Sequence, residues 1–543
     1  MRRSVVLRLL PLVFLSVFIV ICILNLSILL PSGRQHRSLT EPLLKVLHEQ
    51  SESKEHFCRA YFEQLATNLD RDSLLENVSV RKPWIRTFVG HIRAYGACFL
   101  AGNTELEDEM VTGLEQKLFP LFSGKYPVVT KWDGTVEPSP EKTTNSFWGN
   151  RKAAFSGRGI VLSMSDAGFQ ESKRLLRVLR FLENDLPIQM VHKGDLSKSS
   201  MEQLTQVARS DMDLEYAKSS ICPPQEIYFV DASEALSEGV SKYFMRFSNK
   251  WIASLFNTFD EMILMDTDVV PFVEPSALFG YETYKQTGAY FFRDRLTKEA
   301  TWTTPMAFFR SLHPTEDERK AFQLNDYRPI AESTGFFQSK SKHVMESGMV
   351  ALRRSSHFTG LLISTAMQFW HETSGPFYGD KELFWLGQVY AGQEKFAFNK
   401  HGAAGIGELT ETEKTWKVCS AQPAHFDDEN KLLWINGGLQ KCKKGFHQKD
   451  YSSSKALREK FTSAEDLHEY YRSPAHITGA VIPTKKRGFV QDRAQGCIGY
   501  LWCASVPKEE ALLSVVMFSP EQLDRIKQIQ HLWYGPEYQT YDL

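Results

Sequence analysis

Short apolar runs alternate with amphipathic stretches in the middle of the chain. Four of these runs have the length of buried strands, at residues 159–163, 186–191, 226–230 and 262–265. Between them, apolar residues recur at helical spacing over residues 170–184, 201–209 and 234–259. Strands that alternate with helices predict a mostly parallel sheet with right-handed crossovers.

The pattern becomes mixed beyond residue 268. We expect short strands at residues 288–292, 335–338 and 395–398, and helices at residues 356–371 and 383–390. Residues 418–426 and 432–435 predict a late β-hairpin. Upstream of the sheet, helical spacing from residue 57 to 122 predicts a helical subdomain, and a turn-rich stretch at residues 133–150 indicates a boundary.

Two acidic residues follow the fourth apolar run directly. Asp266-Thr267-Asp268 stands where the predicted strand leaves the sheet, so the carboxylates of Asp266 and Asp268 can converge on one ligand. Mg²⁺ and Mn²⁺ favour such oxygen ligands, and the bound cation can hold a diphosphate. Open α/β sheets bind ligands at such strand ends, although two acids can also simply cap a turn. The GxGxxG and GxxxxGK motifs of dinucleotide-binding and P-loop sites do not occur.

The N-terminus carries a separate signal. Arg2, Arg3 and Arg8 precede residues 9–30, which contain no charged residue and are long enough to span a bilayer. We predict a retained signal anchor because no small-residue cleavage pattern follows; the alternative is a cleaved signal peptide. The positive-inside rule then leaves the tail in the cytosol and the remaining chain in the secretory lumen. Asn77 begins an Asn-Val-Ser sequon, which is a glycosylation site in that compartment.

These signals divide the chain into consecutive parts. Residues 1–8 form the cytosolic tail and residues 9–30 the transmembrane anchor. Residues 31–150 form a stem and a helical subdomain, and residues 151–445 form the α/β domain. Residues 446–543 form a C-terminal extension whose structure the pattern does not predict.

Composition narrows the class of protein. The 543 residues are 42% hydrophobic and 12% aromatic, which is typical of a globular chain. A formal net charge of −1 gives no reason to expect nucleic-acid binding. Of the 8 cysteines, only Cys22 lies in the predicted anchor. In an oxidising lumen we expect the others to form disulfides with one left over, and we predict pairs between sequence neighbours, Cys419 with Cys442 and Cys497 with Cys503.

An ordered series of motifs accompanies the acid pair. It continues with Glu-Ser-Gly at 346–348, FYGDKExFWLG at 377–387, Ala-His-Phe at 424–426 and LLWINGG at 432–438. Over residues 150–445 this series resembles the fungal Golgi α-1,3-mannosyltransferase family, which caps yeast-type mannan chains. The resemblance implies a GT-A-like nucleotide-sugar-binding fold, GDP-mannose as donor, Mn²⁺ as cofactor and retention of configuration. It also implies a type II protein of the Golgi membrane and a mannosylated glycan on a glycoprotein as acceptor.

The metal site is predicted around the acid pair. We expect Asp266 and Asp268 to hold Mn²⁺ against the donor phosphates, directly or through water. Because similar transferases take a further ligand from a late strand, His425 is the candidate third ligand. The alternative is that His425 is a structural histidine, and Asp427 or Asp428 then takes its place.

Other residues are candidates for donor binding and for the transfer step. Similar transferases place a lysine such as Lys250 on the donor phosphates, whereas the alternative is a solvated helix face. Asp380 and Glu382 flank the start of a predicted helix and either cap it or lie beside the reacting sugar, with Glu346 as a further candidate. Retaining transfer runs through a covalent intermediate on a carboxylate or through a front-face reaction in which the phosphate oxygen deprotonates the acceptor. We favour the front-face reaction, with Asp380 orienting hydroxyl groups.

Other classes of protein fit part of this pattern. An aspartate-nucleophile phosphohydrolase also begins with an apolar strand that ends in DxD, but there the motif opens the domain. Here several βα units precede the motif, and no downstream set of threonine and lysine is evident. A transferase for another nucleotide sugar is one alternative, and an inactive glycan-binding or scaffolding relative is another, although the intact Asp266, Asp268 and His425 argue against an inactive site. The leading prediction is therefore a membrane-anchored retaining mannosyltransferase.

Overall fold

The computed structural model describes residue 49 and residues 53–535, except 69–81, 103, 213–221, 301–304, 394, 444–445, 484–487 and 492–495. The predicted cytosolic tail and anchor, and the sequon at Asn77, lie outside the described residues. In the part of the chain that the structure describes, no helix is both long enough and apolar enough to cross a membrane.

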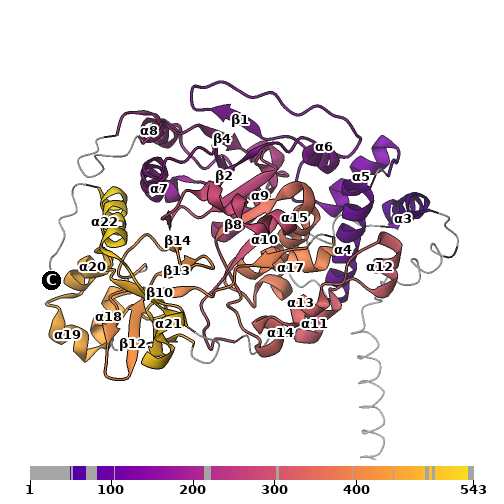
Figure 1. Cartoon of the computed structure of the whole chain (residues 1–543). Coiled ribbons are helices and arrows are strands. Elements are labelled where there is room, and N and C mark those ends of the chain that lie inside the picture. Colours follow the sequence, from indigo (N-terminus) through magenta and orange to yellow (C-terminus); the bar gives the residue numbers. More distant parts are fainter. Residues whose placement is uncertain are drawn as a thin grey trace, which may run out of the picture.

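A mixed sheet of eight described strands forms the centre of the molecule, in the order β1-β4-β3-β2-β5-β8-β7-β9 (Figure 1). Strands β4, β3, β2 and β5 are parallel, whereas β1 and β8 run antiparallel to their neighbours. The four predicted apolar strands are confirmed as β2, β3, β4 and β5. The bounds are β1 (Val128–Lys131), β2 (Arg158–Ser163), β3 (Ile188–His192), β4 (Ile227–Asp231), β5 (Glu261–Met265), β7 (Ala289–Arg293), β8 (Met345–Arg353) and β9 (Ala397–Phe398).

Both faces of this sheet are covered. Ile160 and Leu162 of β2 pack into one hydrophobic cluster and Val161 into another, because successive strand residues point to opposite faces. The helices of the first cluster include α7 (Phe169–Phe181), α8 (Lys198–Arg209) and α22 (Pro520–Tyr534). The second cluster holds α9 (Asn249–Phe256), α15 (Arg354–Phe369) and α17 (Lys381–Ala391), and the N-terminal α3 (Lys54–Asn68), α4 (Lys82–Tyr95) and α5 (Asp108–Leu118). The predicted helical segment is therefore part of the main core.

A second sheet lies against the end of the acid-pair motif. Its described strands follow the order β18-β15-β10-β13-β14-β6. The predicted late hairpin is confirmed in part: β13 pairs antiparallel with β14, whereas residues 418–420 of its predicted first arm belong to another sheet. A smaller sheet has the order β11-β12-β17-β16. The bounds are β6 (Val269–Pro271), β10 (Ala404–Gly407), β11 (Thr410–Glu411), β12 (Thr415–Ser420), β13 (Pro423–Phe426), β14 (Leu432–Asn436), β15 (Gly479–Val481), β16 (Val490–Gln491), β17 (Trp502–Pro507) and β18 (Val515–Met517). Strands from beyond residue 445 thus complete both sheets.

Two predicted elements are wrong. Residues 234–259 do not form one amphipathic helix; three short 3₁₀ turns precede the helix, which covers only Asn249–Phe256. Positive φ angles at Gly239 and Arg246 break the helical path. Residues 335–338 lie in α14 (Gly335–Ser339) instead of a strand. Their two buried aromatic residues, Phe336 and Phe337, fit the core equally well from a helical turn, which a short apolar pattern cannot distinguish from a strand.

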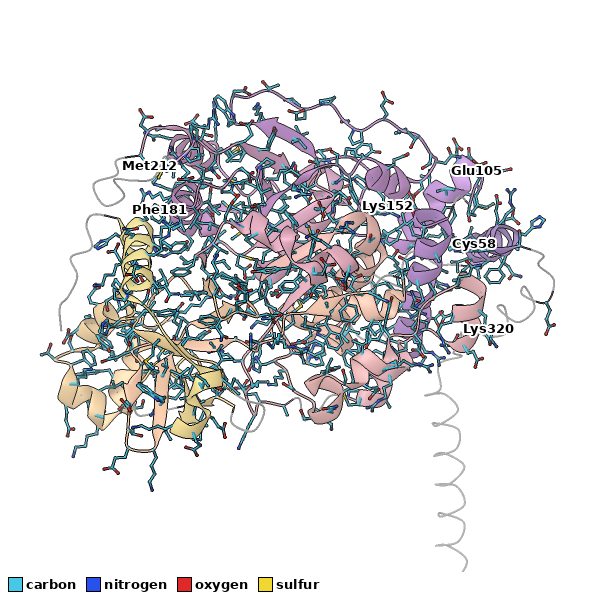
Figure 2. All side chains as sticks on the ribbon, in the orientation of Figure 1. Cys58, Glu105, Lys152, Phe181, Met212 and Lys320 are labelled. Carbon is cyan, nitrogen blue, oxygen red and sulfur yellow. A yellow bond between two sulfur atoms is a disulfide. The ribbon has the colours of Figure 1, made fainter. Side chains whose placement is uncertain are left out.

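The disulfide pairs also differ from those predicted. Cys58 pairs with Cys98 and joins α3 to the turn that follows α4 (Figure 2). Cys419 pairs with Cys503, which lies directly opposite it on the paired strands β12 and β17, and Cys442 pairs with Cys497. The neighbour pairing is therefore wrong, because strand register brings distant cysteines together. The buried Cys222 is the thiol left over among the described cysteines.

Candidate active site

The acid pair occupies the junction of the two large sheets. Strand β5 ends at Met265 and β6 begins at Val269, so the motif is the turn between them. The backbone N–H of Asp266 donates to the carbonyl of Gly348 at 2.8 Å. The N–H groups of Gly437 and Gly438 donate to the carbonyl of Asp268 at 3.1 and 2.9 Å. Three of the sequence motifs that lie far apart along the chain therefore meet at this turn.

Lys250 lies in the first turn of α9 and is buried at the centre of a polar cluster. Its Nζ lies 2.8 Å from the Asp266 carboxylate and 3.1 Å from the Asp380 carboxylate. It also donates to the carbonyl and the hydroxyl oxygen of Ser347, at 2.9 and 3.2 Å. With a side chain that is only 6% exposed, Lys250 does not lie on a solvated helix face. The structure brings Lys250, Asp266 and Asp380 together, as a site requires.

Burial and neighbouring charges both shift the pKa of Asp266. Burial raises the pKa of its carboxyl to about 7, the ammonium of Lys250 opposes this shift, and the carboxylates of Asp268 and Asp380 add to it. Lys250 itself has a raised pKa because its two carboxylate partners outweigh the effect of burial. Three acids thus lie close together around Lys250, and they exceed the nearby lysines, Lys250 and the Asp268 partner Lys443, by one.

Asp268 has a second lysine as its partner. The Nζ of Lys443 lies 2.5 Å from the Asp268 carboxylate, and it donates to the side-chain oxygen of Asn436 at 3.4 Å. Lys443 is not among the predicted site residues, because it lies beyond the recognised motifs and far from Asp268 along the chain. The only hint in the sequence is that Lys443 follows the LLWINGG motif and the cysteine at 442 closely.

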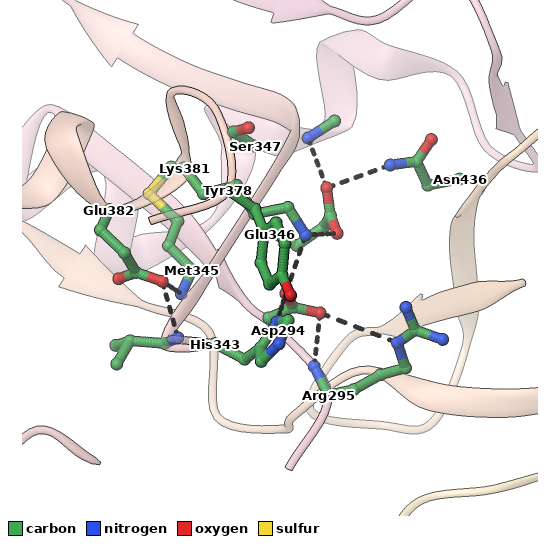
Figure 3. A network of polar contacts seen from close by, with 12 residues as sticks. Asp294, Arg295, His343, Met345, Glu346, Ser347, Tyr378, Lys381, Glu382 and Asn436 are labelled. Atoms are coloured by element: carbon green, nitrogen blue, oxygen red, sulfur yellow. Dashed lines mark hydrogen bonds and ion pairs between the residues drawn. The ribbon is translucent and has the colours of Figure 1, made fainter. Parts of the chain in front are cut away.

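A second charged network surrounds Glu346 (Figure 3). The ammonium of Lys381 lies 2.8 Å from the carboxylates of both Glu346 and Asp294. The other oxygen of Glu346 accepts hydrogen bonds from the N–H of Gly348 and the side-chain amide of Asn436, both at 3.0 Å. Asn436 therefore joins this network to Lys443 and the acid pair.

His343 closes the far end of the same network. Its two ring nitrogens each lie 3.0 Å from a carboxylate, of Asp294 and of Glu299. Burial disfavours the protonated ring, but these two acids outweigh it and raise the pKa of His343. Likewise, burial opposes ionisation of Asp294 and Glu346, yet Lys381 outweighs it and lowers both carboxyl pKa values. Sequence analysis missed Asp294 and His343, which carry no motif of their own.

Glu382 makes structural hydrogen bonds and contacts neither the Lys250 cluster nor the Glu346 network. Its carboxylate accepts the N–H groups of Val344 and Met345 at 2.8 and 3.2 Å, and the indole N–H of Trp385 at 2.6 Å. Burial raises the pKa of the Glu382 carboxyl to about 7. Two of these contacts tie the start of β8 to α17 and the third lies within α17. The candidate catalytic role of Glu382 is therefore not supported, and its neighbour Asp380 is the member of this pair that contacts Lys250.

His425 does not join the acid pair. Its ring stacks on Trp434 with the ring centroids 4.0 Å apart and meets Phe292 edge-on, and burial lowers its pKa to about 4. Asp427 caps the turn after β13 by accepting backbone N–H groups. In the part of the chain that the structure describes, no three histidine, cysteine, aspartate or glutamate side chains are grouped so as to hold a metal ion. The predicted ligand set with His425 is therefore not assembled.

Two carboxylates remain as the donor set for a metal. Asp266 and Asp268 supply hard oxygen atoms on one turn, with the carboxylate of Asp380 close to the same lysine as Asp266. Mg²⁺-type cations are commonly bound by one or two carboxylates together with substrate phosphates. The pair therefore fits a divalent cation that is shared with a diphosphate, although not a cage made of protein ligands alone.

Comparison with known proteins gives a family. Residues 157–427 match a family model with the description "Mannosyltransferase putative". The chain is 34% identical to the α-1,3-mannosyltransferase MNT2 of Saccharomyces cerevisiae, over 77% of this chain and 81% of that protein. It is 27% identical to the α-1,3-mannosyltransferase MNT3 of the same yeast, over 90% of this chain and 85% of that protein.

Likeness to solved structures is more remote. The yeast mannosyltransferase Ktr4p has a TM-score of 0.28 and 10% identity, covering 62% of this chain and 84% of that protein, which adds nothing on the site. The sequence likeness to MNT2 spans most of both proteins and confirms the family predicted from the ordered motifs. The chain therefore belongs to the mannosyltransferase family.

Proposed function

We propose that the protein transfers mannose from GDP-mannose to a mannosylated glycan of a glycoprotein and forms an α-1,3 linkage with retention of configuration. The linkage and the sugar are supported by the names of the relatives, MNT2 and MNT3. The observation that carries the proposal is the acid pair, Asp266 and Asp268, which the two sheets hold at the end of the parallel strands. That position is where nucleotide-binding α/β sheets place their ligands, and it supports the GT-A class.

Asp266 and Asp268 are the residues that would hold Mn²⁺. A divalent cation there supplies positive charge to the oxygens of the leaving diphosphate. Lys250 keeps Asp266 and Asp380 in place, and its buried ammonium adds a fixed positive charge behind the motif. The chain thus prepares the electrostatics of the leaving-group site before any substrate binds.

Asp380 and Glu346 are the carboxylates proposed to orient the reacting groups. Glu346 has a lowered pKa because Lys381 outweighs burial, so it is ionised at neutral pH and accepts hydrogen bonds without donating one. Asp380 is fixed by Lys250. In a front-face reaction, these carboxylates position sugar hydroxyl groups, and the departing phosphate oxygen takes the proton of the acceptor hydroxyl.

The compartment is proposed from chemistry. We place the catalytic part in the lumen of the Golgi, behind a type II anchor at residues 9–30. Three disulfides among the described cysteines support this proposal, because such bonds form and persist in oxidising compartments.

Turnover of sugar nucleotides tests the function. Detergent-solubilised full-length protein is incubated with GDP-mannose, with and without Mn²⁺ and an α-mannoside acceptor, and GDP release and the linkage of the product are measured. We expect Mn²⁺-dependent release that the acceptor accelerates, and a product with an α-1,3 bond. If the protein turns over a different nucleotide sugar but not GDP-mannose, the transferase function stands and the donor is wrong. If it turns over no nucleotide sugar, the proposed function is refuted.

A further inference from the structure

Lys443 differs from Lys250 in how many of its N–H donors are already used within the protein. A lysine ammonium carries three N–H donors. The ammonium of Lys250 contacts two carboxylates and Ser347, and the Lys250 side chain is only 6% exposed. Lys443 makes one close ion pair with Asp268 and one long contact with Asn436, and its side chain is 33% exposed. Of these two cations beside the motif, Lys443 is therefore the one that can reach a ligand from solvent.

A diphosphate at this turn gains from a lysine in addition to the metal ion that the acid pair is proposed to hold. Two carboxylates, Asp266 and Asp268, would repel its negative charge, and unit charges about 4 Å apart interact by about 4 kcal/mol at the effective dielectric of a protein surface. Lys250 cannot turn outward without leaving the carboxylate of Asp380, which is 2% exposed, buried and unpaired. Lys443 is the more exposed of the two lysines and its partner Asp268 is 23% exposed, so its ammonium can meet phosphate oxygens while it stays beside Asp268.

The backbone directly before Lys443 is tied to the C-terminal part of the chain. The preceding residue, Cys442, is joined by a disulfide to Cys497, and its N–H donates to the carbonyl of Tyr471 at 2.9 Å. The hydroxyl of Tyr471 in turn accepts the N–H of Cys497 at 2.7 Å. Residues from the C-terminal part of the chain thus fix the position of a charge at the motif.

We propose that Lys443 binds the diphosphate of the sugar-nucleotide donor, and that the C-terminal region serves to fix it there through the Cys442–Cys497 disulfide. This inference deepens the proposed function and rests on it for the nature of the donor. It assigns donor binding to a lysine outside the matched family segment, which ends at residue 427. Lys250 then acts as a positioning residue that holds two acids.

Calorimetry of diphosphate binding tests this assignment. Full-length wild-type protein and the variants Lys443→Ala, Lys443→Arg and Lys441→Ala are titrated with GDP, UDP and inorganic pyrophosphate in the presence of Mn²⁺. Lys441 is the matched control, because it lies two residues away and its ammonium stacks on Tyr470 at 4.1 Å instead of contacting the motif. Thermal unfolding and a count of free thiols show that each variant is folded with its disulfides intact.

We expect Lys443→Ala to weaken binding of GDP and of pyrophosphate by about 10- to 100-fold, as for loss of a hydrogen bond to a charged group. Lys443→Arg should stay near wild type, and Lys441→Ala should match it. An effect of Lys443→Ala no larger than that of Lys441→Ala would overturn the assignment, as would a wild-type protein that binds none of the probes. If UDP binds in place of GDP and Lys443→Ala weakens it, the GDP-mannose proposal fails while the role of Lys443 stands.

Discussion

Replacing Lys250 by methionine tests how the site is held together. Methionine keeps most of the length and the apolar stem but removes the ammonium. It leaves Asp266 and Asp380 without their shared partner; Asp380 has a side chain that is 2% exposed. Removal of one member of a buried ion pair typically costs about 3–5 kcal/mol. We therefore expect the free energy of unfolding at pH 7.5 to fall by roughly that amount.

The destabilisation caused by Lys250→Met should depend on pH. Asp266 already has a pKa raised to about 7, and loss of Lys250 raises it further. A carboxyl whose pKa is higher in the folded than in the unfolded protein stabilises the fold at low pH, and that contribution is lost as pH rises through the folded value. The destabilisation of Lys250→Met relative to wild type should therefore shrink as the pH falls from 8 toward 5.

Urea denaturation at several pH values, followed by tryptophan fluorescence, measures both effects. Lys320→Met is the matched control, since Lys320 makes an exposed ion pair with Glu316 and its removal should leave stability unchanged. In the double variant Lys250→Met with Asp380→Asn, part of the loss should be recovered. A loss that is the same at every pH, or no recovery in the double variant, would contradict the proposed charge balance.

Three further predictions concern the surroundings of the site. Wild-type His343 has a raised pKa beside Asp294, so its stabilising contribution is complete below its unfolded pKa and disappears as pH rises through its folded pKa. The variant His343→Gln lacks this contribution and should therefore lose less stability than the wild type as pH rises above about 6.5. A denaturation series between pH 6 and 8 checks this. Gly379→Ala should destabilise by about 1–2 kcal/mol for the left-handed backbone alone and lower kcat, since φ is 68° and an added Cβ would lie 2.7 Å from Cγ of Phe247; wild-type kcat would argue against tight packing there. Glu382→Gln should lower Tm but change kcat/KM per folded molecule by less than about threefold. A large loss of kcat at unchanged Tm would instead indicate a catalytic role for Glu382.

The sequence predicts best what local patterns determine. The apolar runs at β2, β3, β4 and β5 are short, continuous and bounded by turn residues, and all four form the parallel part of the sheet. The acid pair follows the last of these runs directly, so its place at a strand end follows from the pattern. Asp380 and Glu346 enter the site with motifs that carry them.

Local sequence patterns do not predict which residues distant along the chain contact one another. Lys443 reaches Asp268 only because β14 pairs with β6 and the disulfide at Cys442 anchors the chain. Asp294 and His343 belong to the Glu346 network through β7 and β8, and nothing in the residues around them marks them as charged-site residues. The helix expected before the motif fails where the exposed Arg246, a non-glycine residue, takes a positive φ angle that apolar spacing does not reveal.

The central claim is that the acid pair holds the leaving diphosphate of a mannose donor. Its most direct test compares Mn²⁺-dependent mannosyl transfer from GDP-mannose by the wild-type protein and by Asp268→Asn, with thermal unfolding as the control for folding. Asparagine keeps the size of the side chain and removes its charge. We expect the variant to retain its fold and to lose at least about 100-fold in kcat/KM, as for loss of a charge that acts in the transition state. Transfer at the wild-type rate by a folded Asp268→Asn would contradict the claim.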